Sequence, residues 1–422
     1  GPLHHRVGGW GAPLGIELRA DGEAALMMLV FGAVGALVSV HGHAHFGPGP
    51  RRGLFSALSL FALGALNALL LSRDVFNLYV SLELLTLAAV GMVALERTRA
   101  AASAALRYLL LALLGSLLYL VGVALVYGAS ATLDLTLLER RLAPGAVASV
   151  ALVLLAAGLC LKVALFPLHA WLPPAYTSAA PPVSAFLSGL LGKASFVVLL
   201  RLWPAVFPAV SRQELAHVIG ALAGAAVLWG SLVALLQRRL RSLIAYSSIA
   251  HVGYLLLFVP LGTPSARAGA VYLAASHAAA SAAMFTAAGT VERTTGSDAI
   301  EALEGLAHHR PLTFFAIAIA GVSLMGLPPS GGFIAKWLLV RSALERGQWW
   351  LALVVLAGGL MAAGYVFRVL RGAFLPSRHP AGELAWATSV GSEGPPFALA
   401  LIALALGVAP RWPLALLEGG PR

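Results

Sequence analysis

The amino-acid sequence has 422 residues, of which 59% are hydrophobic and only 11% are charged. An average soluble domain has about 25% charged residues, so this chain has too few polar side chains to cover a water-facing surface. A soluble fold is therefore excluded, and most of the surface must face a lipid bilayer. The formal net charge of +11 comes from arginines scattered between apolar segments, without a basic stripe, which argues against a nucleic-acid partner.

Apolar runs recur along the whole chain and show little alternation of apolar with polar residues, which favours helices over a transmembrane β-barrel. Each run has about 20 residues, the length that crosses a hydrocarbon core. We predict an all-α polytopic membrane protein with about twelve transmembrane helices and one membrane domain over residues 1–422. A short surface helix is expected at residues 132–141. The predicted spans are residues 23–41, 53–72, 75–95, 103–127, 145–168, 183–203, 215–236, 241–260, 267–290, 312–340, 347–369 and 395–410.

The cysteine and histidine content limits metal and redox chemistry. Cys160 is the only cysteine, so the chain has no internal disulfide, no thiolate zinc site and no iron–sulfur cluster of its own. His41, His43 and His45 lie at the end of a span with no cysteine or carboxylate nearby, so no metal is expected there. We therefore expect no cofactor and no catalytic site in this chain, and any redox chemistry would belong to a partner.

Two predicted spans carry residues that interrupt helices. One contains Pro167, and the other contains Pro328 and Pro329 within the segment GLPPSGG. Proline removes a backbone donor, and glycine permits non-helical dihedral angles. If the chain divides into five-helix units at residues 53–203 and 215–370, each break falls in the fourth helix of its unit. Paired breaks at matching positions are typical of transport pathways built from repeats, although ordinary proline kinks are the alternative.

The chain has only three lysines, Lys162, Lys193 and Lys336, and all three lie inside apolar spans, whereas the loops use arginine. Arginine stays protonated, whereas a lysine that is held away from water can exchange its proton near neutral pH. This distribution predicts that the three lysines handle protons. The alternative is that their ammonium groups extend to the lipid headgroups.

Other ionisable side chains accompany these lysines. Glu83 is the one carboxylate in the middle of a predicted span, where an ionised carboxyl is costly unless it is paired, and Lys162 is a candidate partner. His251 and His277 titrate near neutral pH, although single histidines in apolar helices are often only hydrogen-bonded core residues. Further candidate relay groups are His169, Tyr246, Ser247 and Ser248.

Several motifs together carry a specific resemblance. They are KVALFPLHAWLPPAY at residues 162–176, APPVS at 180–184, GK at 192–193, QRRLRSLIAYSSIAH at 237–251 and GLPPSGGFIAKW at 326–337. These motifs resemble those of the antiporter-like, proton-conducting membrane subunits shared by respiratory complex I, membrane-bound hydrogenases and Mrp-type cation/proton antiporters. The resemblance covers nearly the whole chain. GGWGAPLGIE at 8–17 and DVFNLY at 74–79 are most similar to the Mrp D-type and hydrogenase-type branches.

The resemblance implies two inverted five-helix repeats, each with one broken helix, and a polar axis along the membrane midplane. It places six residues of this chain on that axis, namely Glu83, Lys162, Lys193, His251, His277 and Lys336. It also implies a multi-pass protein of a prokaryotic cytoplasmic membrane that works with other membrane subunits. The chain starts where the third helix of the family would begin, so two family helices are expected to be absent or supplied by another polypeptide.

We therefore expect a subunit of a larger complex that moves protons, with sodium as a second candidate ion, along a buried Glu/Lys/His axis. The energy would come from a redox-driven oxidoreductase or from an opposing cation gradient in an Mrp-type antiporter. A structural subunit that keeps the fold without conducting is the alternative, and Ser281, where the family often has lysine, favours it. A stand-alone solute carrier is a third hypothesis, but no substrate-specific feature supports it.

Overall fold

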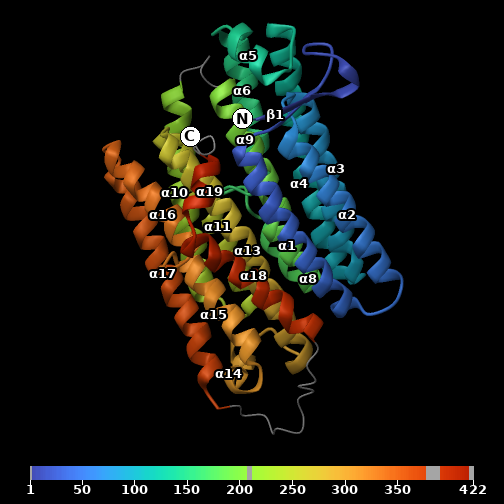
Figure 1. Cartoon of the computed structure of the whole chain (residues 1–422), viewed down its shortest axis with the longest axis vertical. Helices are drawn as coiled ribbons and strands as arrows, with labels where there is room; N and C mark the ends of the chain where they lie inside the picture. The colour runs from blue at the N-terminus through green and yellow to red at the C-terminus, as the bar shows by residue number, and fades with distance from the viewer. Residues whose placement is uncertain (1, 207–211, 377–389, 418–422) are drawn as a thin grey trace.

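The structure is a computed structural model that describes residues 2–206, 212–376 and 390–417. It is an elongated helical bundle in which most helices run along the long axis (Figure 1). Among the described residues, 10 helices are long and apolar enough to cross a membrane. The two remaining predicted spans, 145–168 and 312–340, are divided into shorter helices. The all-α polytopic fold is confirmed.

Within the described residues 2–206, the first half of the chain contains two short strands and nine α-helices. The strands β1 (Leu3–Arg6) and β2 (Glu17–Ala20) pair antiparallel, with Leu3 opposite Ala20. The short helix α5 confirms the surface helix that the sequence predicts near residues 132–141. The helices are α1 (Gly22–Phe46), α2 (Pro50–Leu71), α3 (Val75–Val93), α4 (Arg99–Ser130), α5 (Leu135–Arg141), α6 (Ala146–Lys162), α7 (Leu172–Ser178), α8 (Pro181–Gly189) and α9 (Ala194–Ala205).

The second half of the chain is helical throughout its described part, apart from connecting turns. Its helices are α10 (Arg212–Leu236), α11 (Leu240–Leu256), α12 (Phe258–Leu261), α13 (Pro264–Thr295), α14 (Leu306–His309), α15 (Pro311–Met325), α16 (Gly331–Glu345), α17 (Trp349–Phe374), α18 (Val390–Val408) and α19 (Arg411–Leu417).

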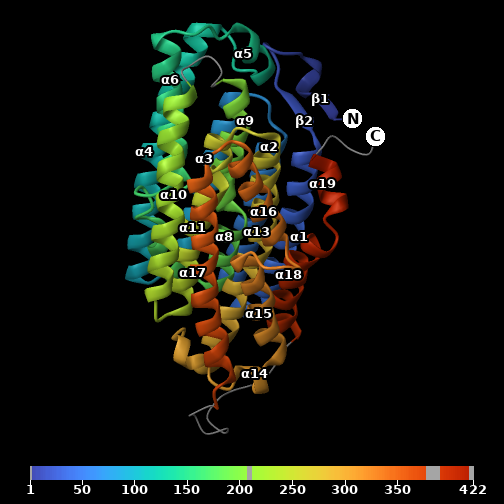
Figure 2. The same ribbon diagram turned by 90° about the vertical axis from the view of Figure 1, so that its left-hand side faces the viewer.

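The two halves run through the bundle in opposite directions. Helix α2 ends beside the N-terminal strands, where Ser72 forms a bridge with Leu18. Helix α10 ends at the opposite end of the molecule, near α14, where Arg239 forms a bridge with Ala299 (Figures 1 and 2). The fourth helix is divided in each half, as α6–α7 and as α15–α16. This is the arrangement expected for inverted five-helix repeats.

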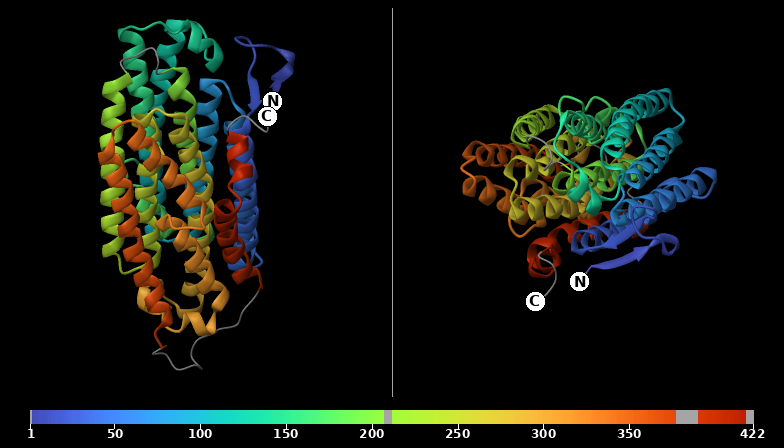
Figure 3. Two further views of the ribbon diagram at one scale, coloured as in Figure 1. Left: turned by 60° about the vertical axis from the view of Figure 1, so that its left-hand side comes forward. Right: turned by 90° about the horizontal axis from the view of Figure 1, so that it is seen from above.

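The most buried helices lie at the centre of the bundle (Figure 3). In α13 and across α8–α9, 94% of the apolar stretch is buried, compared with 39% in α2, α4 and α17. Alanine dominates α13, and small side chains let neighbouring helices approach closely. The outer helices instead expose large apolar side chains such as Leu60, Leu117 and Leu360, as a lipid-facing surface requires. Polar residues on the central helices are therefore removed from lipid.

Candidate functional site

The first interruption lies between α6 and α7. Helix α6 ends at Lys162, residues 163–171 form turns, and α7 begins at Leu172. Pro167 lies within these turns and has no backbone N–H to donate. The carbonyl of Leu161 accepts a hydrogen bond from Nε1 of Trp171 at 3.1 Å, so a polar group freed by the break finds a partner inside the protein, as lipid surroundings require. The break that the sequence predicts at Pro167 is confirmed.

Lys162 and Glu83 form an ion pair in the first half. The Nζ of Lys162 lies 2.7 Å from Oε1 of Glu83 on α3 and 3.2 Å from Oγ1 of Thr86. The hydroxyl of Ser116 on α4 donates to the same carboxylate oxygen at 2.5 Å. The side chains of Lys162 and Glu83 are 4% and 22% exposed, so both charges are largely desolvated. Such a pair needs additional hydrogen bonds to offset desolvation, and Thr86 and Ser116 supply them.

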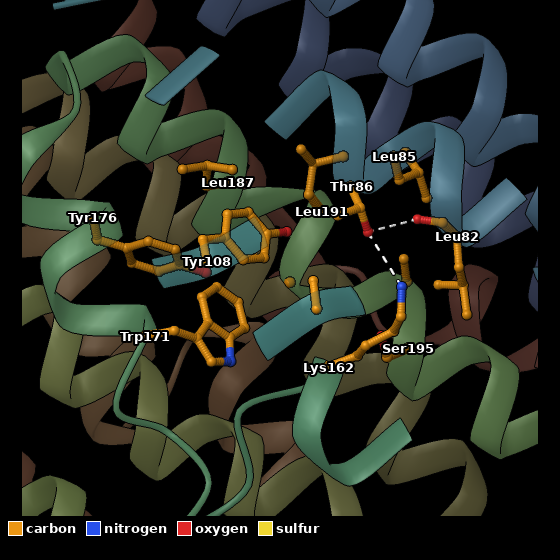
Figure 4. A pocket seen from close by; sticks show the side chains of 13 residues that line it. Leu82, Leu85, Thr86, Tyr108, Lys162, Trp171, Tyr176, Leu187, Leu191 and Ser195 are labelled. Carbon is orange, nitrogen blue, oxygen red and sulfur yellow. Dashed lines mark hydrogen bonds between the residues drawn. The ribbon is translucent and has the colours of Figure 1, made fainter. Parts of the chain in front are cut away.

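A small cavity of about 20 Å³ adjoins this pair. Lys162 and Thr86 line one side, and the aromatic residues Tyr108, Trp171 and Tyr176 line the other (Figure 4). The rings of Tyr108 and Trp171 are stacked, with their centroids 4.3 Å apart and their planes at 4°. A cavity needs about 10–15 Å³ to hold one water, so this one has room for about one.

Lys193 lies in a distortion that the sequence analysis missed. The predicted span 183–203 is present, but α8 ends at Gly189, residues 191–193 form a single 3-10 turn, and α9 begins at Ala194. The Nζ of Lys193 donates a hydrogen bond to the carbonyl of Ser188, and the side chain is buried. The glycines in SGLLGK were the available signal for this irregularity.

A second cavity, also of about 20 Å³, connects Lys193 with His251 and His277. The two imidazole rings are stacked, with centroids 4.2 Å apart. The Nδ1 of His251 lies 2.8 Å from the carbonyl oxygen of Ser247, which can only accept, so Nδ1 carries the proton and Nε2 is able to accept one. Within the described residues, neither ring nitrogen of His277 has a hydrogen-bond partner. Each histidine therefore has at least one ring nitrogen that forms no hydrogen bond with the described residues.

The second interruption lies between α15, which ends at Met325, and α16, which begins at Gly331. The break that the sequence predicts at Pro328 and Pro329 is confirmed. Gly326 adopts a left-handed conformation with φ of +81°. The backbone conformation therefore favours glycine, and a Cβ at this position, 2.5 Å from Cδ of Lys336, would displace the lysine side chain.

Lys336 is held by the carbonyls that this break releases. Its Nζ donates to the carbonyl oxygens of Leu324 at 2.9 Å and Met325 at 3.0 Å. It also lies 4.6 Å from the ring centroid of Tyr254, within the range of a cation–π interaction. Among the described residues, neither Lys336 nor Lys193 forms an ion pair. The second half therefore stabilises its lysine without a carboxylate.

The other candidate relay groups divide into two pairs. Ser247 contacts the hydroxyl of Tyr365 at 2.9 Å, and Ser248 lines the second cavity and contacts Ser188 at 3.1 Å. Tyr246 packs against the edge of the core, and His169 stacks on Phe166 with centroids 5.4 Å apart. Neither Tyr246 nor His169 lines the two cavities described above. Ser248 thus lies at the second cavity, and Ser247 is next to it only through the contact of its carbonyl with His251, whereas Tyr246 and His169 line neither cavity.

Several groups at this site were not identified from the sequence. Thr86 lies three residues after Glu83, on the same face of α3, and helical spacing alone could have revealed it. Trp171 and Tyr176 stand within the motif at residues 162–176, but nothing in that motif distinguishes cavity-lining residues from core residues. Ser116 and Tyr254 come from distant segments, so only the folded chain places them.

The chain is similar to a known family of membrane proteins and to several of its members. The chain matches the protein family described as NADH:quinone oxidoreductase/Mrp antiporter, TM, over residues 72–362. It is 39% identical over 381 residues to NADH-quinone oxidoreductase subunit N of Desulforudis audaxviator, with coverage of 89% of this chain and 76% of that protein. It is 27% identical over 410 residues to a subunit of the Na(+)/H(+) antiporter of Bacillus subtilis, with coverage of 96% and 83%.

A solved structure shows the same fold. A chain of the membrane-bound sulfane sulfur reductase, an archaeal respiratory membrane complex, superposes with a TM-score of 0.90 at 32% identity, covering 99% of this chain and 85% of that one. The family match extends over more than half of the chain and contains both helix breaks and all six axis residues. The protein therefore belongs to the family of antiporter-like membrane subunits found in NADH:quinone oxidoreductases and Mrp antiporters.

Proposed function

We propose that this chain moves protons across a membrane as one subunit of a larger complex. The observation that carries the proposal is the burial of all three lysines inside the bundle, where a carboxylate or backbone carbonyls hold each ammonium group. The chain uses arginine at every other basic position, so the property that lysine adds is the ability to release a proton. The proposed path comprises Glu83, Lys162, Lys193, His251, His277 and Lys336.

Glu83 controls the first transfer in this proposal. While its carboxylate remains 2.7 Å from Nζ, it retains the proton on Lys162. If Glu83 turns away or is itself protonated, Lys162 loses its counter-ion in a poorly solvated site and releases its proton toward Lys193. The side chain of Glu83 is 22% exposed, so it has more freedom to move than the lysine it contacts.

The histidine pair and Lys336 complete the path. Nε2 of His251 accepts a proton from Lys193 through the second cavity, and the stacked ring of His277 lies next along the path. Lys336 then receives the proton, and its bonds to Leu324 and Met325 keep the ammonium group solvated by carbonyls without neutralising its charge. We assign residues 53–203 and 215–370 to two repeats that contribute the two ends of this path.

Partner subunits supply the driving energy in this proposal. The similar proteins are named as subunits of a quinone oxidoreductase and of a sodium/proton antiporter, and the similar structure is part of a respiratory complex. Either a redox reaction or a sodium gradient could therefore drive transport, with sodium as a second transported ion. The bacterial and archaeal sources of these relatives support a prokaryotic cytoplasmic membrane.

A structural subunit without conduction is the second candidate function. Ser281 favours it, because this buried side chain lies in α13 one helical turn from His277. A serine hydroxyl does not take up a proton to become a cation, as a lysine amine does. The paired Glu83 and Lys162 favour conduction, because replacing a buried ion pair with apolar residues is often neutral or stabilising, so packing alone does not require it.

The test is proton uptake by proteoliposomes that contain the purified native complex, driven by its own substrate or by an imposed sodium gradient. Glu83→Gln and Lys162→Ala should each reduce the rate per assembled complex by about tenfold or more, because the first step needs both partners. Breaking a buried pair costs about 3–5 kcal/mol, so assembly must be measured on native gels and used to normalise the rate. Glu345→Gln, which removes the exposed pair with Arg341, is the matched control and should leave transport unchanged. Wild-type transport by assembled Glu83→Gln would contradict the proposal.

A further inference from the structure

The cavities beside Lys162 and Lys193 are separated by a thin wall of three residues. Trp171, Tyr176 and Gly192 line both cavities. A proton that moves from Lys162 to Lys193 must therefore pass this wall. Figure 4 shows the rings of Trp171 and Tyr176 on the side of the first cavity away from Lys162.

Only one of the three wall residues has a side chain able to relay a proton. Gly192 has no side chain, and the indole of Trp171 can only donate and already does so, to the carbonyl of Leu161 at 3.1 Å. The phenol of Tyr176 can both donate and accept. The described residues provide no hydrogen-bond partner for this hydroxyl, which leaves it available to water in either cavity.

The position of the Tyr176 hydroxyl fits a link to Lys193. A Cβ built on Gly192 would lie 3.0 Å from this hydroxyl oxygen, so the hydroxyl rests against the backbone of the residue that precedes Lys193. The ring is buried and contacts Phe285 edge-on, with centroids 5.8 Å apart. The Tyr176 carbonyl accepts from Ser184 at 2.6 Å, which fixes the backbone at this point. The hydroxyl is therefore held beside Gly192, a residue that lines both cavities.

We propose that the hydroxyl of Tyr176 relays the proton from Lys162 to Lys193, an inference that rests on the proposed function. Each cavity measures about 20 Å³ and has room for about one water. The Lys162 ammonium gives a proton to the first water, which gives one of its protons to the tyrosine oxygen. The original hydroxyl proton leaves at the same time for the second water, which protonates the Lys193 amine. One proton has then moved, Lys162 is neutral, Lys193 is an ammonium, and rotation of the hydroxyl resets the relay without a free tyrosinate.

The first test is Tyr176→Phe in the intact complex, which keeps the ring and removes the relay atom. A positioned proton-transferring side chain typically contributes about 100- to 10,000-fold, and water can replace part of that, so we expect at least a tenfold loss of proton uptake per assembled complex. Tyr119→Phe is the matched control, because Tyr119 is a buried tyrosine of the same half whose hydroxyl donates to the carbonyl of Val75 at 3.1 Å, away from both cavities. It should stay within twofold of wild type. Uptake at the wild-type rate in Tyr176→Phe overturns the relay.

The second test separates a relay from a packing role. Difluorotyrosine incorporated in place of Tyr176 keeps the ring and the hydroxyl but makes the phenol more acidic. The relay needs the neutral phenol, so transport is retained at low pH while the alkaline limb of the pH–rate profile moves to lower pH, and an unchanged profile overturns the relay. This variant also decides the question if Tyr176→Phe does not assemble. If the wild-type complex transports protons and Glu83→Gln stops it while both Tyr176 variants behave as wild type, only the relay fails and the proposed function stands.

Discussion

Replacing lysine by arginine at positions 193 and 336 is the most direct test of why this chain has lysine there at all. Both side chains are buried, and both donate hydrogen bonds to backbone carbonyls at an irregular segment of helix. A guanidinium can replace the charge and most of these hydrogen bonds. It cannot release a proton in the physiological range, so the substitution separates charge from titration.

The expected magnitude follows from the chemistry of the two groups. The ordinary pKa of arginine, about 12.5–13.8, exceeds that of lysine, about 10.4, by roughly 2 to 3 units. The two sites impose the same burial on either side chain, so the deprotonated fraction should fall by about 100- to 1,000-fold. If proton release from Lys193 or Lys336 is required in each cycle, Lys193→Arg and Lys336→Arg should reduce proton uptake almost as strongly as alanine does.

The assay is proton uptake in proteoliposomes with the purified complex, normalised to assembly on native gels. Arg201→Lys provides the reciprocal control, because Arg201 is a buried cation on α9 that donates to the carbonyls of Leu70 and Ser72, away from the axis. This control is expected to lower stability but not the rate per assembled complex. Wild-type uptake in both Lys193→Arg and Lys336→Arg would refute the titratable-lysine mechanism and favour a structural subunit.

Three further outcomes follow from local geometry. Gly326→Ala should lower both assembly and transport, because the new Cβ would lie 2.5 Å from Cδ of Lys336; normal uptake would show that the break relaxes freely. Tyr254→Leu should slow transport several-fold, whereas Tyr254→Phe should not. The reason is that the cation–π contact between Lys336 and this ring, at 4.6 Å, contributes about 0.5–2 kcal/mol and needs only the ring. Equal rates in both variants would remove Tyr254 from the mechanism. Glu393→Gln removes the carboxylate of the buried ion pair with Arg310, so it should reduce the amount of assembled complex. Proton uptake per assembled complex should stay unchanged. A drop in uptake per assembled complex would place this pair in the transport path.

The fold could be predicted well from the sequence because its clearest patterns, long apolar runs and prolines within them, reflect strong physical constraints. About 20 consecutive apolar residues have few alternatives to a membrane-spanning helix. A proline such as Pro167 or Pro328 inside such a helix removes a donor, and lipid cannot replace it. Both breaks are therefore visible in the sequence and present in the structure. The buried positions of Lys162 and Lys336 could be predicted for the same reason, since each lies close to a break.

The partners of the axis residues were harder to predict because they come from separate segments. Glu83 and Lys162 could be matched because Glu83 is the one carboxylate in the middle of a predicted span and Lys162 lies beside a predicted helix break. The carbonyls that hold Lys336 could not be identified in this way, because the sequence does not show which carbonyls a break leaves within reach of Nζ. The distortion at Gly189 was missed since a 3-10 turn within an otherwise apolar helix changes neither its length nor its hydropathy.

The three lysines are held by different chemistry, and this difference shapes how transport could be controlled. Lys162 has a carboxylate partner, whereas Lys336 has two carbonyls and an aromatic ring, and Lys193 has one carbonyl. A carboxylate competes for the proton and can withdraw by moving a single side chain, whereas backbone carbonyls only accept hydrogen bonds and are fixed by the helices around them. In the proposed path, electrostatic control is therefore concentrated at Glu83. Proton release at Lys193 and Lys336 would respond instead to the arrival of a neighbouring proton or water, and we expect transport to start at the end of the path where a charge can move.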